Sequence, residues 1–257
     1  MRITTWNVNG LRAAIRKGFA DQIEKINPDV LLLQEIRVRP EQLSADWAAP
    51  AGWHVTWHPA EKPGYAGTAV WTRRPHRVIA RGLHDEESCE QGRLLHVEVG
   101  KVEVASVYLP SGSASAESQQ RKEAWMSRFK VWADSAISRT APLLIGGDLN
   151  IAHTERDIFY AKSNQKQSGF MPHEREWFSL LLNSGWQDLV RTFAGDIDGP
   201  YSWWSNRGQA RAKDRGWRID YLLANPPAAM LFSKAHTHRE GGLVVSDHAP
   251  VSIDLEM

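Results

Sequence analysis

The sequence predicts an α+β fold in which two mixed β-sheets pack face to face, with helices on their outer faces. Short apolar runs of strand length recur along the whole chain, separated by glycine, proline and charged turns. Only three stretches have helical spacing, and no repeat of fixed period is present. With 257 residues, of which 42% are apolar and 24% charged, the chain can bury a large core. We therefore expect a single domain over residues 1–257.

The first predicted strand covers residues 3–8. Apolar residues then recur every three or four positions from Leu11 to Ile26, which predicts one amphipathic helix that ends before Pro28. The apolar run at 30–34 is typical of a fully buried strand. Consecutive strand-like segments follow at 53–58, 67–72, 77–80, 94–99 and 102–109.

The second half begins with a helix expected from about 118 to 138, with Trp125, Phe129, Trp132 and Ala136 on one face. Residues 143–146 are again a buried strand. A third helix is predicted from Pro172, at its first position, to a stop at Gly185. Further strands are expected near 201–204, 218–224 and 249–255.

Composition excludes several classes of protein. The net charge of +1, from 31 basic and 30 acidic residues, is not that of a uniformly basic DNA-binding protein, although it says nothing of local patches. The single cysteine, Cys89, excludes a disulfide framework and a thiolate zinc site. The polar start of the chain does not resemble a signal peptide, and no apolar run reaches membrane-spanning length. These features predict a cytoplasmic protein without membrane association.

Polar residues follow the apolar strand runs, where layered α/β proteins place ligand sites. One further acid, Asp220, lies inside the apolar run 217–222 and needs a partner, for which His248 is the obvious candidate. The strand-end residues are Asn7, Asn9, Glu35, Asp148, Asn150, Asp247 and His248.

Each of these residues alone is more simply a turn former or a helix cap, and strand-end position gives about one chance in five of a chemical role. Together they are harder to explain as turns. Converging carboxylates repel one another unless a divalent cation or a protonated imidazole lies among them. Oxygen ligands without clustered histidine or cysteine favour Mg²⁺ or Mn²⁺ over zinc.

Six motifs occur in order along the chain: WNVNGLR at 6–12, LQE at 33–35, YLP at 108–110, GDLN at 147–150, WRIDY at 217–221 and SDHAP at 246–250. Each is weak alone, but the ordered set resembles the exodeoxyribonuclease III type of apurinic/apyrimidinic endonuclease over essentially the whole length. That family belongs to a superfamily with DNase-I-like nucleases and with inositol and sphingolipid phosphoesterases. The resemblance implies a DNase-I-like, four-layer α/β/β/α sandwich.

The resemblance also implies catalytic roles. Glu35, Asn9 and Asp247 match metal ligands, and Asp148 and Asn150 adjoin the same ion. Asp148 matches the residue that deprotonates the attacking water, which Asn7 and Asn150 hold. The pair of His248 and Asp220, together with the phenol of Tyr108, would face the phosphate. Either Asp148 or the His248–Asp220 pair serves as the base, and sequence leaves that choice open.

A basic, tryptophan-rich segment from 203 to 218 predicts contacts with nucleic acid. In the family, residues matching Trp203, Trp217 and Ile219 form the pocket for the abasic deoxyribose. The alternative is that these rings are core and the arginines a solvated loop. The positions expected to contact DNA also include Arg207, Lys213, Arg218, Asn164, Ser111 and, less strongly, Gln167. Ser111 and His173 depart from the residues usual in the family.

The leading hypothesis is a Mg²⁺-dependent phosphodiesterase of DNA repair, with Mn²⁺ as an alternative ion. It would act as a monomer on damaged double-stranded DNA, cutting 5′ to abasic sites or trimming blocked 3′ ends. A phosphoesterase acting on inositol phosphates or lipid head groups is the alternative in the same fold. A non-catalytic nucleic-acid-binding module is the third hypothesis.

Overall fold

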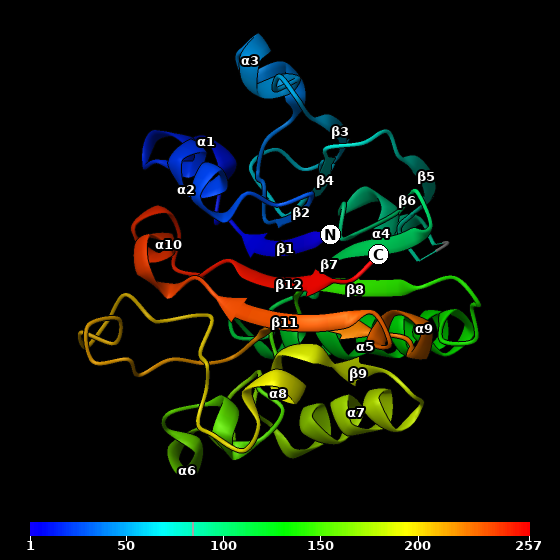
Figure 1. Cartoon of the computed structure of the whole chain (residues 1–257). Helices are drawn as coiled ribbons and strands as arrows, with labels where there is room; N and C mark the ends of the chain where they lie inside the picture. Colours follow the sequence, from blue (N-terminus) through cyan, green and yellow to red (C-terminus); the bar gives the residue numbers. More distant parts are fainter. Residues whose placement is uncertain (84) are drawn as a thin grey trace.

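The structure, a computed structural model, describes residues 1–83 and 85–257. It confirms the predicted fold class, because two six-stranded sheets pack face to face between helices (Figure 1). The spatial order of the first sheet is β11 (Phe232–Thr237), β12 (Val251–Leu255), β1 (Arg2–Asn7), β2 (Val30–Gln34), β4 (Thr68–Thr72) and β3 (His54–His58). That of the second is β5 (Arg77–Arg81), β6 (Leu94–Val99), β7 (Val102–Tyr108), β8 (Leu143–Asp148), β10 (Asp220–Ala224) and β9 (Gln187–Asp188).

Each sheet is built around one parallel pair of strands. In the first sheet β1 runs parallel to β2, and in the second β7 runs parallel to β8, whereas the other pairings are antiparallel. The last register positions of these pairs are Asn7 with Gln34 and Tyr108 with Asp148. The register therefore brings the predicted polar strand ends together, within each sheet, at the carboxyl end of its parallel pair.

Helices cover both outer faces of the sandwich. Trp125, Phe129 and Phe178 of α5 (Ala116–Ala136) and α7 (Pro172–Asn183) pack on the second sheet. On the first sheet lie α1 (Leu11–Arg16), α2 (Phe19–Ile26) and α10 (Arg239–Val245) (Figure 1). A separate core of aliphatic side chains joins the two sheets. The shorter helical elements are η1 (Pro40–Gln42), α3 (Ala45–Ala48), α4 (Glu86–Glu90), η2 (Glu155–Asp157), α6 (Ala161–Asn164), α8 (Leu189–Ala194) and α9 (Pro226–Ala229).

Three predictions of local structure were wrong. The helix expected over residues 11–26 is two helices, because Gly18 has a left-handed φ of 99° that ends one and begins the next. Residues 201–204 form no strand but only isolated bridges from Trp203 to Trp217 and to His248. The last error concerns Asp220, which is the first residue of β10 rather than a mid-strand charge. The hydroxyl of Ser202 accepts hydrogen bonds from the amides of Ile219 and Asp220, so a loop pairs with this segment just before β10 begins.

Half of the twelve tryptophans belong to the buried core. These six are at most 9% exposed, so the interpretation of the tryptophan surplus as a binding feature does not apply to them: Trp6, Trp71, Trp125, Trp132, Trp186 and Trp204. Among the residues that the structure describes, no helix is both long and apolar enough to cross a membrane.

Candidate active site

A cavity of about 390 Å³ opens where the two parallel pairs end. Residues from both sheets and from the loops that follow their strands line it. In the part of the chain that the structure describes, these are Asn9, Glu35, Arg37, Tyr108, Ser111, Ser113, Asp148, Asn150, Asn164, Gln167, Ser168, Trp203, Trp217, Ile219, Asp247 and His248.

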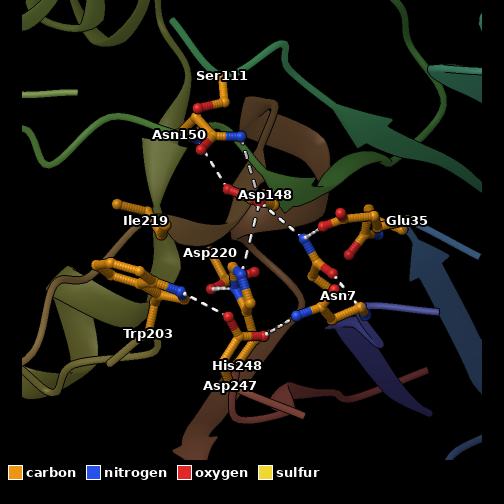
Figure 2. Close-up of polar contacts among 12 residues, drawn as sticks. Asn7, Glu35, Ser111, Asp148, Asn150, Trp203, Ile219, Asp220, Asp247 and His248 are labelled. Atoms are coloured by element: carbon orange, nitrogen blue, oxygen red, sulfur yellow. Dashed lines mark hydrogen bonds and ion pairs between the residues drawn. The ribbon is translucent and has the colours of Figure 1, made fainter. Parts of the chain in front are cut away.

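His248 and Asp220 form the buried pair that the sequence predicted. Nδ1 of His248 lies 2.9 Å from Oδ2 of Asp220, and Nε2 lies 3.9 Å from Oδ2 of Asp148 (Figure 2). Burial opposes a charge on the ring, but Asp220, Asp148 and Asp247 outweigh it and raise the pKa of His248 to about 10. The imidazole is therefore positively charged at neutral pH, with both ring nitrogens as donors.

Asp148 is held among neutral amides. Its Oδ2 accepts a hydrogen bond of 2.9 Å from Nδ2 of Asn7, and its Oδ1 accepts one of 2.9 Å from the backbone amide of Asn150. Burial and the nearby Asp220 raise the pKa of Asp148 to about 7, although the charge of His248 and the amides oppose the shift. A carboxylate with this pKa can take up a proton near neutral pH and is suited to general base catalysis.

Glu35 lies beside Asp148 and is joined to it through one amide. The same Nδ2 of Asn7 donates to Oε2 of Glu35 at 2.9 Å (Figure 2). The guanidinium of Arg37 contacts Oε1 of Glu35. At the lower end of the site, Oδ1 of Asp247 accepts from the amide of Asn9 at 2.8 Å. Its Oδ2 accepts from the indole of Trp203 at 3.1 Å. Burial works against ionisation of Asp247, but His248 and these donors lower its pKa.

The turns that carry the polar residues are backbone-strained. Asn9, Glu35, Arg37 and Asn150 all have left-handed φ values, between 45° and 55°. A non-glycine residue in this region costs of order 1–2 kcal/mol, and such residues cluster at functional sites. Each of these turns directly follows a central strand and directs its polar side chain towards the cavity.

Two groups of polar residues at the cavity contain possible ligands for a cation. Oxygen and nitrogen atoms of Asp148, Asp220 and His248 lie within 4.8 Å of one another. Because the charged imidazole has no free lone pair, this trio is not suited to hold a cation. Glu35, Asn9 and Asp247 offer only oxygen ligands and line the same cavity, which suits a hard divalent ion. That these three residues hold a metal ion stays a prediction.

Several residues predicted to contact DNA line one wall of the cavity. Trp203 and Trp217 meet edge to face, with centroids 6.1 Å apart and planes at 84°, and Ile219 packs in the same cluster. Asn164 and Ser111 line the cavity too, with Ser111 Oγ 2.9 Å from Ser113 Oγ. The predicted DNA contacts Arg207, Lys213 and Arg218 lie outside the lining, the first two on the exposed loop 205–216. His173, the departure from the family pattern, also lies outside it and pairs with Glu123.

The prediction that Arg218 contacts DNA was wrong, because its side chain is buried in this structure. It is 1% exposed, and its guanidinium bonds to Asp157 and Asp188, each at 2.7 Å. Trp217 and Ile219 line the cavity, while Arg218, which lies between them in the sequence, points into the protein towards Asp157 and Asp188.

The sequence reasoning missed Arg37, Ser113 and Ser168 as cavity residues. Arg37 follows the predicted ligand Glu35 by two positions, and this closeness in sequence could have indicated that Arg37 lies at the cavity. The two serines belong to polar loops without a distinctive pattern.

The profile of the Endonuclease/Exonuclease/phosphatase family matches residues 4–248, which is almost the whole chain. The chain belongs to this family.

Members of the family with assigned names match over nearly full length. The chain is 34% identical over 254 residues to an exodeoxyribonuclease of Bacillus subtilis, covering 98% of each. It is 34% identical to the DNA repair nuclease APEX1 of Danio rerio, covering 99% of this chain and 82% of that protein. Among solved structures, an AP endonuclease from Archaeoglobus fulgidus has the same fold, with a TM-score of 0.91 at 23% identity and full coverage of both chains. A 3′-5′ exonuclease from Neisseria meningitidis reaches 0.88 at 28% identity, again with full coverage of both.

Proposed function

We propose that this protein is a phosphodiesterase of DNA repair that cleaves damaged double-stranded DNA 5′ to abasic sites and removes blocking groups from 3′ ends. The names of its full-length relatives support the reaction class. The observation that carries the proposal is the cavity itself, where a positively charged, buried imidazole and a carboxylate with a pKa of about 7 lie 3.9 Å apart beside an indole-lined wall.

Asp148 is the general base in this proposal. Because Asp220 keeps His248 charged, the imidazole cannot accept a proton, whereas Asp148 can accept one from a water that attacks the phosphorus atom. Asn7 and Asn150 fix the orientation of the Asp148 carboxylate. His248 and the buried phenol of Tyr108 then act as donors to the phosphate oxygens, whose negative charge grows in the transition state.

Mg²⁺ is the proposed ion, with Mn²⁺ as an alternative, and Glu35, Asn9 and Asp247 would hold it. When bound, it would neutralise negative charge on the phosphate and the leaving oxygen. Arg37 now balances the charge of Glu35 and would give way to the ion. That Asp148 and Asn150 also serve as ligands stays a prediction.

The wall formed by Trp203, Trp217 and Ile219 would accommodate a deoxyribose that has lost its base, since flat apolar side chains tolerate a sugar but offer no hydrogen bonds to a base edge. Asn164 and Ser111 would contact flanking phosphates, and Arg207 and Lys213 would reach phosphates from the exposed loop. We further propose that residues 1–257 act as one domain and as a cytoplasmic monomer.

Charge disfavours the alternative substrates. Inositol phosphates and lipid head groups carry several phosphates or lie at a membrane, and their recognition requires several free cations. Of the described residues that line the cavity, Arg37 and His248 are the cations, and both are already paired with carboxylates.

A defined-lesion assay tests the proposal. A labelled duplex with one tetrahydrofuran abasic analogue is expected to be nicked in Mg²⁺ and to stay intact in chelator. A matched duplex with a 3′-phosphate reports the second activity, and release of phosphate from an inositol polyphosphate tests the alternative. Asp148→Asn serves as the inactive control. If the purified protein cleaves neither duplex, the proposed function is wrong.

A further inference from the structure

Arg93 is a buried cation that the proposed mechanism leaves unused. It directly precedes β6 and is 3% exposed. Its guanidinium donates to the side chain of Gln91 at 2.6 Å, to the carbonyl of Tyr108 at 3.1 Å and to the phenol of Tyr65 at 2.7 Å. Among the side chains that the structure describes, no carboxylate forms an ion pair with it. A buried charge satisfied only by neutral groups is unfavourable for stability, so its presence needs another explanation.

The guanidinium lies directly against Tyr108. Its central carbon is 4.8 Å from the centroid of the Tyr108 ring and 5.4 Å from that of Tyr65. The backbone amide of Tyr108 also donates to the carbonyl of Arg93 at 2.8 Å, so each residue binds the main chain of the other. Tyr108 lines the cavity, whereas Arg93 does not. Arg93 therefore holds the ring from the side away from the substrate.

Arg93 also differs from the other cations near the site. Glu35 balances Arg37, and Asp220 balances His248, so most of the field of each is cancelled at short range. No described carboxylate pairs with Arg93 in this way, and its polar partners are neutral groups. In a buried environment, where screening by water is weak, the charge of Arg93 polarises the Tyr108 phenol that lies between it and the cavity and so makes that hydroxyl a stronger donor.

We infer that Arg93 is a positioning residue for the phosphodiesterase reaction, which fixes the Tyr108 phenol at the cavity wall and, through its charge behind the ring, makes the Tyr108 hydroxyl a stronger donor. The inference rests on the proposed function. A donor that is already oriented needs no reorganisation when charge develops on the phosphate, and this lowers the barrier of the chemical step more than it strengthens binding.

The test compares Arg93→Met and Arg93→Lys in wild-type and Tyr108→Phe backgrounds. On the abasic duplex, Arg93→Met is expected to lower kcat about 10- to 100-fold, in the range found for groups that orient ligands or donors in active sites. Affinity for the same duplex in chelator, measured by fluorescence anisotropy, should change less than about threefold, because Arg93 does not line the cavity. Arg93→Lys keeps the charge without the planar fork, so its kcat should lie between that of the wild type and that of Arg93→Met.

The tyrosine background separates positioning from a general loss of structure. If Arg93 acts through the Tyr108 hydroxyl, Arg93→Met should cost less than about threefold in Tyr108→Phe. Arg77→Met removes an exposed charge from the same sheet and should leave kcat unchanged. Thermal unfolding is measured for every variant. If Arg93→Met does not fold, the kcat of Arg93→Lys in the two backgrounds tests the inference instead.

Unchanged kcat in a folded Arg93 variant overturns the inference, and so does an equal fold loss in both backgrounds. Both outcomes leave the proposed function standing as long as the wild-type chain nicks the duplex. A wild-type chain that cleaves neither substrate overturns the proposed function and this inference together.

Discussion

Replacing Arg218 by methionine tests whether this residue stabilises the fold or contacts DNA. The guanidinium joins Asp157 and Asp188, whose side chains are 0% and 5% exposed. Asp157 keeps Arg191 and the amide and hydroxyl of Thr154 as partners. Of the described donors, Asp188 keeps the amide of Arg191 at its side chain, at 3.0 Å, and no described cation then pairs with this buried carboxylate.

The expected cost follows from that geometry. Removing one partner of a buried ion pair destabilises by about 3–5 kcal/mol, which is a large part of the usual 5–15 kcal/mol stability of a whole protein. For a chain of this size, 1 kcal/mol corresponds to about 2–4 °C, so Tm should fall by about 6–20 °C. The double variant Arg218→Met/Asp188→Asn should recover part of the loss, because the uncompensated charge is gone while an N-cap acceptor remains.

The assay combines thermal unfolding with the salt dependence of DNA binding. Each lysine or arginine that contacts a phosphate adds about 0.9 to the slope of log K against log salt. Arg207→Met, on the exposed loop, should reduce this slope by about one and leave Tm unchanged. Arg218→Met should lower Tm and leave the slope unchanged. The reasoning is refuted if Arg218→Met keeps the wild-type Tm and loses about one from the salt slope.

Further predictions concern pH, metal and acid stability. The rate of abasic-site cleavage should rise as pH passes about 7, where Asp148 loses its proton, and fall near pH 10, where His248 loses its own. Asp220→Asn should move the upper limb to lower pH, and an unmoved limb would contradict the role of the pair. Glu35→Gln should raise the Mg²⁺ concentration needed for half-maximal rate, which a metal titration measures. Burial works to raise the pKa of Asp157, but Arg218 and Arg191 outweigh it and hold the pKa well below its usual range. Urea unfolding at a series of pH values should therefore show the contribution of Asp157 to stability intact above about pH 4 and lost as the pH falls further.

The sequence was sufficient to predict the bounds of strands in which nearly every side chain is buried. The runs 30–34 and 94–99 were predicted with the bounds of β2 and β6, because nearly every side chain in them is buried and turn residues flank them. By contrast, β11 was missed. It is an edge strand with partly exposed, polar residues, and its apolar signal is correspondingly weak.

The candidate site was predicted by residue but not by orientation. Glu35, Asp148 and His248 could be named because they interrupt or follow apolar runs, where polar residues need a reason. The direction of Arg218 could not be read from its neighbours, since it depends on Asp157 and Asp188, which lie 61 and 30 residues away. In the same way, the pairing of Arg37 with Glu35 depends on the left-handed turn that both residues share.

The site has two parts, strand ends and irregular segments, and this difference explains how one fold can support different phosphoester substrates. Of the groups proposed to react, Asn7, Glu35, Tyr108 and Asp148 lie at the ends of the two parallel strand pairs, and the register of each pair fixes their positions within its sheet. The wall that would face the sugar comes from irregular segments, 158–170 and 203–219, which are anchored by Arg218 from behind and by isolated bridges between Ile158, Trp203 and Trp217. Substitutions in these segments can change the shape offered to the substrate without moving Asp148 or His248. Preference between abasic sites and 3′ ends should therefore respond to substitutions in these segments, while the metal and pH dependence of both activities stays the same.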